Sequence, residues 1–192
     1  MFEKYINNEK LKENIDRWFV KVNKHPEEDI YILNYTNDCQ LAYARDEVNM
    51  QCRGLILDQE WNIIAKPFKK FFNRSEVKEK PTWMPNYILE KVDGSLWIIY
   101  YYKWKRSLAS RGSFDSKQAI KWNKMLSNID MTNCPTNYTY LVEIIYPENR
   151  IVVDYKWKSW LVYLWQVDRN TWEEFFIENW HPFTSQVKQY SF

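Results

Sequence analysis

The glycines of this chain occur in settings that suit phosphate binding. The sequence contains only 3 glycines, and each stands close to a cationic residue in or beside a predicted strand: Gly54 after Arg53, Gly94 three positions after Lys91, and Gly112 after Arg111. Glycine lets the backbone turn sharply or approach a ligand closely, and a neighbouring lysine or arginine suits a phosphate. Each glycine taken alone also fits a hairpin turn beside a solvated cation. The repetition of this setting indicates a nucleotide site.

Residues 66–73 alternate cations with aromatic side chains. The segment carries three lysines and three phenylalanines: Lys66, Phe68, Lys69, Lys70, Phe71 and Phe72. Cations between aromatic rings suit a ligand that has both phosphates and a base. The same residues also fit a solvated basic turn over aromatic core residues.

Two acidic residues stand out by their context. Glu143 lies in the apolar run of residues 141–146, where an unpaired carboxylate would be expensive to bury, so we expect a functional role for it. Asp93, between Lys91 and Gly94, also fits a turn in which its carboxylate bonds its own backbone.

Composition places the chain among folded proteins and narrows the classes of site. At 192 residues with 45% hydrophobic and 27% charged residues, it fits one globular domain. The net charge of +2 is small, so a polyanion site must come from local clustering. Three cysteines and two histidines argue against a disulfide framework and a zinc site. No run reaches the roughly 18 apolar residues of a membrane span, and we expect a soluble, cytoplasmic protein.

The elements that must position these residues are mostly short strands. Apolar spacing predicts a helix over residues 9–22, and a pattern like a capping box that opens at Asp115 predicts another over 115–126. Strands are predicted at 30–35, 54–57, 63–66, 87–92, 96–102, 138–145, 150–155 and 160–167, and residues 172–180 are helical or irregular. The fold class is therefore α+β, with mostly antiparallel sheets and a few packed helices in a single domain, 1–192.

Residues 91–95, Lys-Val-Asp-Gly-Ser, resemble the Lys-x-Asp-Gly nucleophile motif of the covalent nucleotidyltransferases, which include ATP-dependent DNA ligases, RNA ligases and RNA capping enzymes. The surrounding motifs resemble the phage-type RNA ligase 1 family from about residue 35 to residue 170: Gln-Cys-Arg-Gly-Leu at 51–55, Lys-Pro-Phe-Lys-Lys-Phe-Phe-Asn at 66–73, Ser-Arg-Gly-Ser-Phe at 110–114, Glu143, and Pro-Glu-Asn-Arg-Ile-Val at 147–152. The resemblance implies a nucleotidyltransferase domain with an ATP-grasp-like fold.

The resemblance also implies a reaction. Lys91 would attack the α-phosphate of ATP, release pyrophosphate and carry AMP on its ε-nitrogen; AMP would then pass to an RNA 5′-phosphate, and the RNA ends would be sealed. The family's nucleotide contacts fall on Tyr35, Arg53, Lys70, Phe72, Gly94, Arg111 and Glu143. Glu143 would also support binding of the Mg²⁺ cofactor.

Two later motifs of the superfamily, a Glu-Gly-Val type and a Lys-x-Lys type, would fall beyond Phe192 at the family's spacing. The resemblance therefore leads us to expect a domain truncated at its C-terminal side. A separate C-terminal polypeptide could complete the site, or the chain could be a natural short form. The alternative function is a catalytically impaired module that binds nucleotide or RNA.

A site without those phosphate-holding lysines should bind through adenosine and the α-phosphate. AMP should then compete nearly as well as ATP in calorimetric titration, because each charge-assisted contact to the outer phosphates adds about 1.5–3 kcal/mol. An ATP preference above about a hundredfold, some 2.7 kcal/mol, would show that other residues such as Lys156, Lys158 or Lys188 hold the outer phosphates.

Overall fold

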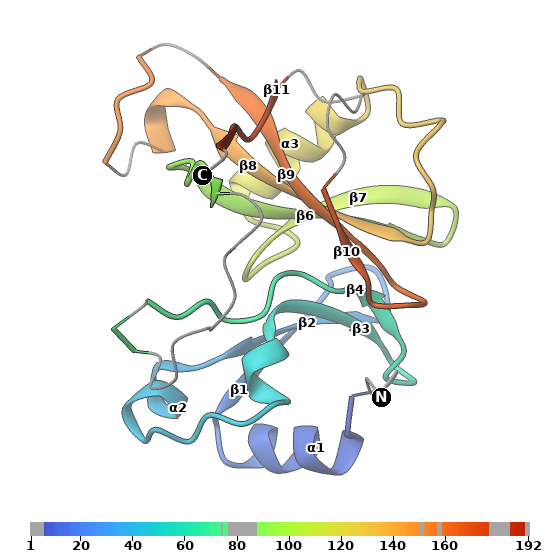
Figure 1. Cartoon of the computed structure of the whole chain (residues 1–192). Helices are drawn as coiled ribbons and strands as arrows, with labels where there is room; N and C mark the ends of the chain where they lie inside the picture. Colours follow the sequence, from blue (N-terminus) through green and yellow to red (C-terminus); the bar gives the residue numbers. More distant parts are fainter. Residues whose placement is uncertain are drawn as a thin grey trace.

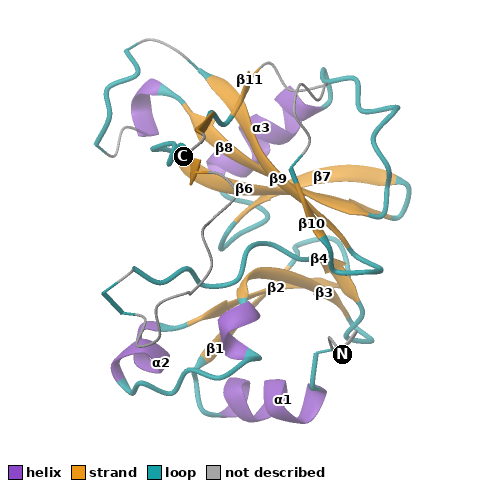
Figure 2. Cartoon of the chain, in the orientation of Figure 1, coloured by secondary structure: helices purple, strands orange, loops and turns teal. Residues whose placement is uncertain are grey.

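The computed structural model describes residues 6–73, 75–76, 88–149, 152–156, 159–176 and 185–190. Two antiparallel sheets dominate this part of the chain (Figures 1 and 2). The first sheet has the order β1-β2-β3-β4, with β1 Val20–Lys24, β2 Ile30–Tyr35, β3 Arg53–Asp58 and β4 Ile63–Ala65. The second has the order β10-β9-β8-β6-β7, with β10 Glu174–Phe175, β9 Trp160–Asp168, β8 Tyr138–Ile145, β6 Ser95–Tyr102 and β7 Lys105–Ser110.

Short elements complete the described fold. Strand β11 (Ser185–Gln186) runs parallel to β9, and β12 (Gln189–Tyr190) pairs with β5 (Ile88–Leu89). The helices are α1 Asn8–Asp16, α2 Asn37–Leu41 and α3 Lys117–Leu126, with 3-10 turns η1 Asn49–Gln51 and η2 Pro147–Asn149. None of the helices in the described ranges has the length and apolarity to cross a bilayer.

The two sheets pack face to face, and each has a helix on its outer face. Ile32 and Ile56 of the first sheet share a core with Ile98 and Leu141 of the second. Helix α3 packs on the far side of the second sheet through Trp122, and α1 packs on the far side of the first (Figure 1). The alternation of side chains along each strand separates these cores. This arrangement confirms the α+β class with mostly antiparallel sheets.

The first predicted helix is too long. Helix α1 ends at Asp16, and residues 20–24 form strand β1 instead. Trp18 has a left-handed backbone with φ of 60°, which breaks the helix because the helical φ is negative. Val20 and Val22 fit the alternation of a strand as well as a helical face, and pairing with β2 decides between the two.

Other predicted bounds also change. Ser116 rather than Asp115 caps α3, since its side chain accepts a hydrogen bond from the amide of Ala119 at 3.1 Å. Residues 152–155 form no strand, and residues 150–151 lie outside the described part. The strand predicted over 87–92 is reduced to Ile88–Leu89, with residue 87 outside the description. Residues 172–176 contain the short strand β10, and residues 177–180 are outside it.

Gly54 and Gly112 differ in the reason for a glycine, although both follow an arginine. Gly54 has φ of +96°, and a Cβ there would stand 2.6 Å from Cδ1 of Ile98 and 3.2 Å from the backbone oxygen of Arg111. A Cβ on Gly112 would meet nothing within 4 Å. Backbone conformation and close packing therefore require a glycine at residue 54, whereas close packing does not require one at residue 112.

We expect Gly54→Ala to lower the free energy of unfolding by about 2 kcal/mol or more, because a left-handed backbone and a tight contact add their penalties. Gly112→Ala is the matched control and should stay within about 0.5 kcal/mol of the wild type. Urea denaturation measures both changes. Equal stabilities for the two variants would contradict this account of Gly54.

Candidate active site

A cavity of about 920 Å³ opens where the two sheets meet. Both sheets and the segments that follow β4 and precede β6 contribute to its wall. Of the site residues predicted from sequence, this cavity is lined by Arg53, Phe72, Lys91, Gly94, Arg111 and Glu143. Tyr35 and Lys70 are not among its lining residues. Side chains spread over some ninety positions of the chain thus share one cavity.

Lys91 lies in the loop between β5 and β6, exposed at the cavity wall. Asp93 anchors this loop to a distant segment, because its carboxylate accepts hydrogen bonds from the amides of Val152 and Val153, both at 2.7 Å. These two bonds lower the pKa of Asp93. The interpretation that Asp93 bonds its own turn is therefore wrong. Because the Val152 and Val153 amides donate to Asp93, they cannot take part in the strand pairing predicted for 150–155.

Gly94 joins the same loop to strand β8. Its amide donates a hydrogen bond to Oε1 of Glu143 at 3.1 Å. A Cβ on Gly94 would stand 2.5 Å from the backbone oxygen of Ile144 and 3.0 Å from Cγ of Glu143, so the close approach requires glycine. The loop that carries Lys91 is therefore fixed to strand β8 three residues further on, at Gly94.

Glu143 faces the cavity because of its place in β8. Tyr140, Val142 and Ile144 point to the core under α3, and alternation turns Glu143 to the opposite side. Burial raises the pKa of Glu143 to about 7, while the Gly94 amide and the charges of Lys91 and Arg53 lower it and Asp93 raises it. The group therefore changes charge near neutral pH.

Two arginines concentrate positive charge opposite this carboxylate. Arg53 begins β3, and burial and the nearby Arg111 lower its pKa, whereas Tyr35 acts in the opposite direction, partly through a hydrogen bond. Nη1 of Arg53 is buried and has no hydrogen-bond partner among the described residues. A buried donor without an acceptor is costly, so this guanidinium fits an anionic ligand such as a phosphate.

Phe72 lines one edge of the cavity, and Lys70 and Tyr35 lie behind that edge. Phe72 is 37% exposed and lines the wall, which rules out the interpretation of this ring as buried core. The Lys70 ammonium lies 5.2 Å from the Phe72 ring centre and 5.7 Å from that of Tyr35. Tyr35 and Lys70 are therefore neighbours of lining residues, one contact away from the cavity itself.

Sequence reasoning missed the apolar part of the wall. Leu164 of β9 and Val187, next to β11, line the cavity, as does Gln118 in the first turn of α3. In the sequence, Leu164 and Val187 have the pattern of ordinary core residues, and Gln118 has that of a solvated helix position. Other lining residues did carry a signal, because they lie in the quoted motifs: Phe68, Phe71 and Asn73 in 66–73, Val92 and Ser95 in 91–95, and Ser110 and Gly112 in 110–114.

A protein-built metal centre is absent from the described residues, where no group of three or more histidine, cysteine or acidic side chains comes together. Magnesium is commonly held by one or two carboxylates together with substrate phosphates. Glu90 and Glu143 are the carboxylates of the cavity wall, and Glu143 interacts with the charge of Arg53. The residues present therefore fit a magnesium ion that arrives with a nucleotide.

The raised pKa of Glu143 gives a test of its burial. Folding disfavours the ionised form of Glu143, so this group lowers the free energy of unfolding once it would be ionised in the unfolded chain. The loss is absent below the unfolded pKa of 4.5, grows as the pH rises to about 7 and stays constant above that. A shift of this size corresponds to about 3 kcal/mol, which partial exposure reduces to about 1–2 kcal/mol. We expect Glu143→Gln to raise the free energy of unfolding by that amount at pH 8.5 and by much less at pH 5.

Glutamine keeps an oxygen that can accept the Gly94 amide, so the comparison isolates the charge. Glu148→Gln, at an exposed position in η2, is the control for an equal change in net charge. Urea denaturation at the two pH values measures the effect. A Glu143→Gln variant no more stable than the wild type at pH 8.5 would contradict the burial of an ionisable carboxylate.

Comparisons with known proteins match two thirds or more of the chain. The family model described as RNA ligase covers residues 51–192. A protein of Autographa californica nuclear polyhedrosis virus, named as a bifunctional polynucleotide kinase/RNA ligase, is 26% identical over 95% of this chain and 30% of its own length. An RNA ligase of Rhodothermus phage RM378 is 27% identical over 67% of this chain and 39% of its own. The chain thus spans about a third of the length of these relatives.

The fold has a solved counterpart. A protein from Aquifex aeolicus, named as an ATP-dependent DNA ligase, aligns with a TM-score of 0.58 and 17% identity over 96% of this chain and 50% of its own. This similarity shows that the chain shares the fold of the aligned half of that protein. Together with the family match over residues 51–192, it confirms the resemblance drawn from the motifs: the chain belongs to the phage-type RNA ligase 1 family.

Proposed function

We propose that this chain is a single adenylyltransferase domain of an ATP-dependent RNA ligase, with Lys91 as its nucleophile. The unprotonated Nζ attacks the α-phosphorus of ATP, a nitrogen–phosphorus bond forms, and the bond to the departing pyrophosphate oxygen breaks. The amine proton is lost to solvent or a neighbouring base. AMP then moves to the 5′-phosphate of an RNA, and a 3′-hydroxyl displaces it to seal the ends.

The hydrogen bond between Gly94 and Glu143 carries this proposal. It holds the Lys91 loop against β8, in the same cavity as Arg53 and Arg111. A nucleophilic lysine needs the phosphate within attack distance and in line, and preorganisation of this kind contributes orders of magnitude to such reactions. Membership in the RNA ligase family supports the same chemistry.

Each wall of the cavity has a matching part of ATP. The two arginines suit the phosphates, since a buried donor of Arg53 has no acceptor within the described ranges. The partly exposed Phe72 ring suits stacking on adenine. The Lys70 ammonium contacts this ring and the ring of Tyr35. Glu143 would contact the ribose or hold Mg²⁺, which would supply positive charge for the departing pyrophosphate.

Mass spectrometry after incubation with ATP and Mg²⁺ tests the nucleophile. We expect Lys91→Ala to abolish covalent AMP, and Lys91→Arg to be equally inactive because a guanidinium stays protonated. Lys124→Ala, which removes an exposed lysine of α3, is the matched control and should form wild-type levels. Lysine-linked AMP in either Lys91 variant at the wild-type level would exclude this residue as the nucleophile.

Nucleotide titration separates the two classes of function. If the wild-type chain binds ATP without gaining AMP, the cavity belongs to a binding module rather than to an enzyme. Glu143→Ala should weaken nucleotide or Mg²⁺ binding and leave the circular dichroism spectrum unchanged. Loss of that spectrum would instead give Glu143 a structural role.

A further inference from the structure

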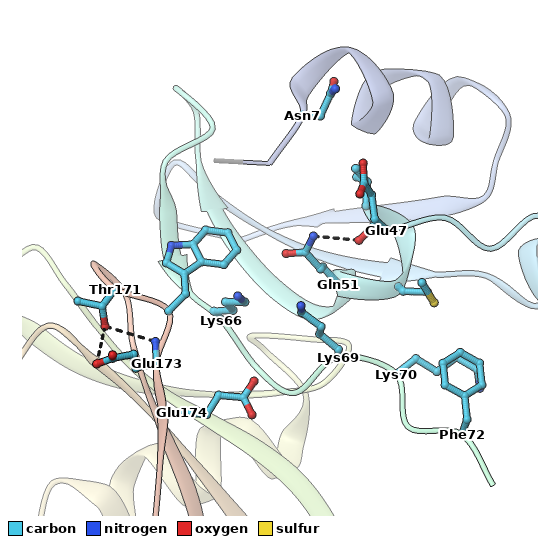
Figure 3. Close-up of a pocket in the computed structure, with 13 residues that line it drawn as sticks. Asn7, Glu47, Gln51, Lys66, Lys69, Lys70, Phe72, Thr171, Glu173 and Glu174 are labelled. Carbon is cyan, nitrogen blue, oxygen red and sulfur yellow. Dashed lines mark hydrogen bonds between the residues drawn. The ribbon is translucent and has the colours of Figure 1, made fainter. Parts of the chain in front are cut away.

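A second cavity, of about 790 Å³, is lined by the residues drawn in Figure 3. The cavity described above, which we propose binds ATP, is called the nucleotide cavity below. Phe72 lines both cavities. The second one is bounded by residues around η1, by the segment that follows β4, and by the turn between β9 and β10. Its cations Lys66, Lys69 and Lys70 belong to the segment in which lysines alternate with aromatic residues.

Lys66 is a buried cation without a carboxylate partner in the described part of the chain. Its residue is 4% exposed, and none of the salt bridges between described residues includes it. Its amide donates to Oγ1 of Thr139 at 3.1 Å, which fixes the backbone, and its Nζ lies 3.4 Å from the ring centre of Trp172. The aromatic ring attracts the ammonium, and an ammonium has three N–H donors, so it can also bind an anionic acceptor.

The charges around Lys66 favour an added anion. Burial and, to a smaller extent, repulsion from Lys69 lower its pKa to about 8, and the opposing attraction by Glu174 is weaker than either effect. Lys70, Glu47 and Glu173 are the other charged residues of the cavity wall. Glu173 accepts a hydrogen bond from the hydroxyl of Thr171 on its own turn, at 3.4 Å (Figure 3). The three lysines of the wall are matched by three glutamates, but Lys69 repels the Lys66 ammonium more strongly than Glu174 attracts it. An anionic group next to Lys66 and Lys69 would relieve that repulsion.

We propose that Lys66 and Lys69 bind one backbone phosphate of an RNA strand whose end passes Phe72 into the nucleotide cavity. This inference rests on the proposed function, because RNA sealing requires a strand to reach the phosphate held at Lys91. Phosphate oxygens are strong acceptors for an ammonium group, and the rings of Phe71 and Phe72, 62% and 37% exposed, offer surfaces on which bases can stack. The glutamates around the cavity limit the attraction to one phosphate position.

Binding of an RNA oligonucleotide that cannot be ligated, with a 5′-hydroxyl and a 3′-phosphate, tests the site without ATP. Fluorescence anisotropy at fixed ionic strength should show Lys66→Gln binding about tenfold more weakly than the wild type, as expected for loss of one charged contact. Lys124→Gln is the matched control on α3 and should bind within about twofold of the wild type.

The pH dependence gives a second signature. Wild-type affinity should fall as the pH rises from 7 to 9, because the Lys66 ammonium loses its proton in this range. Lys66→Arg keeps the positive charge at every pH and should remove most of that fall. In ¹³C-lysine NMR, the oligonucleotide should raise the pKa of Lys66, since an anion favours the charged form.

Equal RNA affinities and equal pH profiles for Lys66→Gln and Lys124→Gln would overturn the inference. If Lys66→Gln lowered the free energy of unfolding but left RNA affinity unchanged, Lys66 would be only a structural contact between the sheets. The test is independent of the proposed reaction. A wild-type chain that fails to form covalent AMP but binds the oligonucleotide through Lys66 would reject the first proposal and retain the second.

Discussion

The hydrogen bond from the Gly94 amide to Glu143 is the constraint on which the site depends. It joins the loop that carries Lys91 to a central strand of the second sheet at 3.1 Å. The backbone of that strand comes so close that a side chain on residue 94 would collide with it. A lysine on a loop would otherwise sample many positions, and this contact, with the two amide bonds to Asp93, restricts the loop to one wall of the cavity.

Burial shapes the chemistry of both cavities. It raises the pKa of Glu143 to about 7 and lowers that of Lys66 to about 8, because a low-dielectric surrounding disfavours either charge. Two groups that are fully charged in water at neutral pH thus titrate near it in this protein. Groups with shifted pKa values cluster at functional sites. Here Glu143 lines the nucleotide cavity, Lys66 lines the second cavity, and Phe72 lines both.

The packing of the two sheets decides where these cavities lie. Residues such as Ile56 and Ile98 fill the space between the sheets with apolar side chains, so the polar side chains of the site lie outside this core, at the cavity that both sheets line. Arg53 and Glu143 reach the nucleotide cavity from opposite sheets. The segment after β4 supplies Phe72 to both cavities and Lys66 to the second one. The shared wall explains why a strand held in one cavity could reach the other.

Local sequence patterns were sufficient to predict the strongly patterned elements and the chemical groups of the site. Strands 30–35 and 138–145 follow from apolar and β-branched residues, and the motifs around Lys91, Arg53 and Arg111 indicate a nucleotide site from residue types and order alone. Tertiary contacts were needed to establish that residues 20–24 form a strand, because that strand requires its partner β2. They also determine that Asp93 bonds residues some sixty positions away, that Tyr35 and Lys70 stop short of the nucleotide cavity, and that Lys66 is buried against Trp172. Each of these outcomes depends on long-range contacts, which neither local propensity nor the spacing of residues encodes.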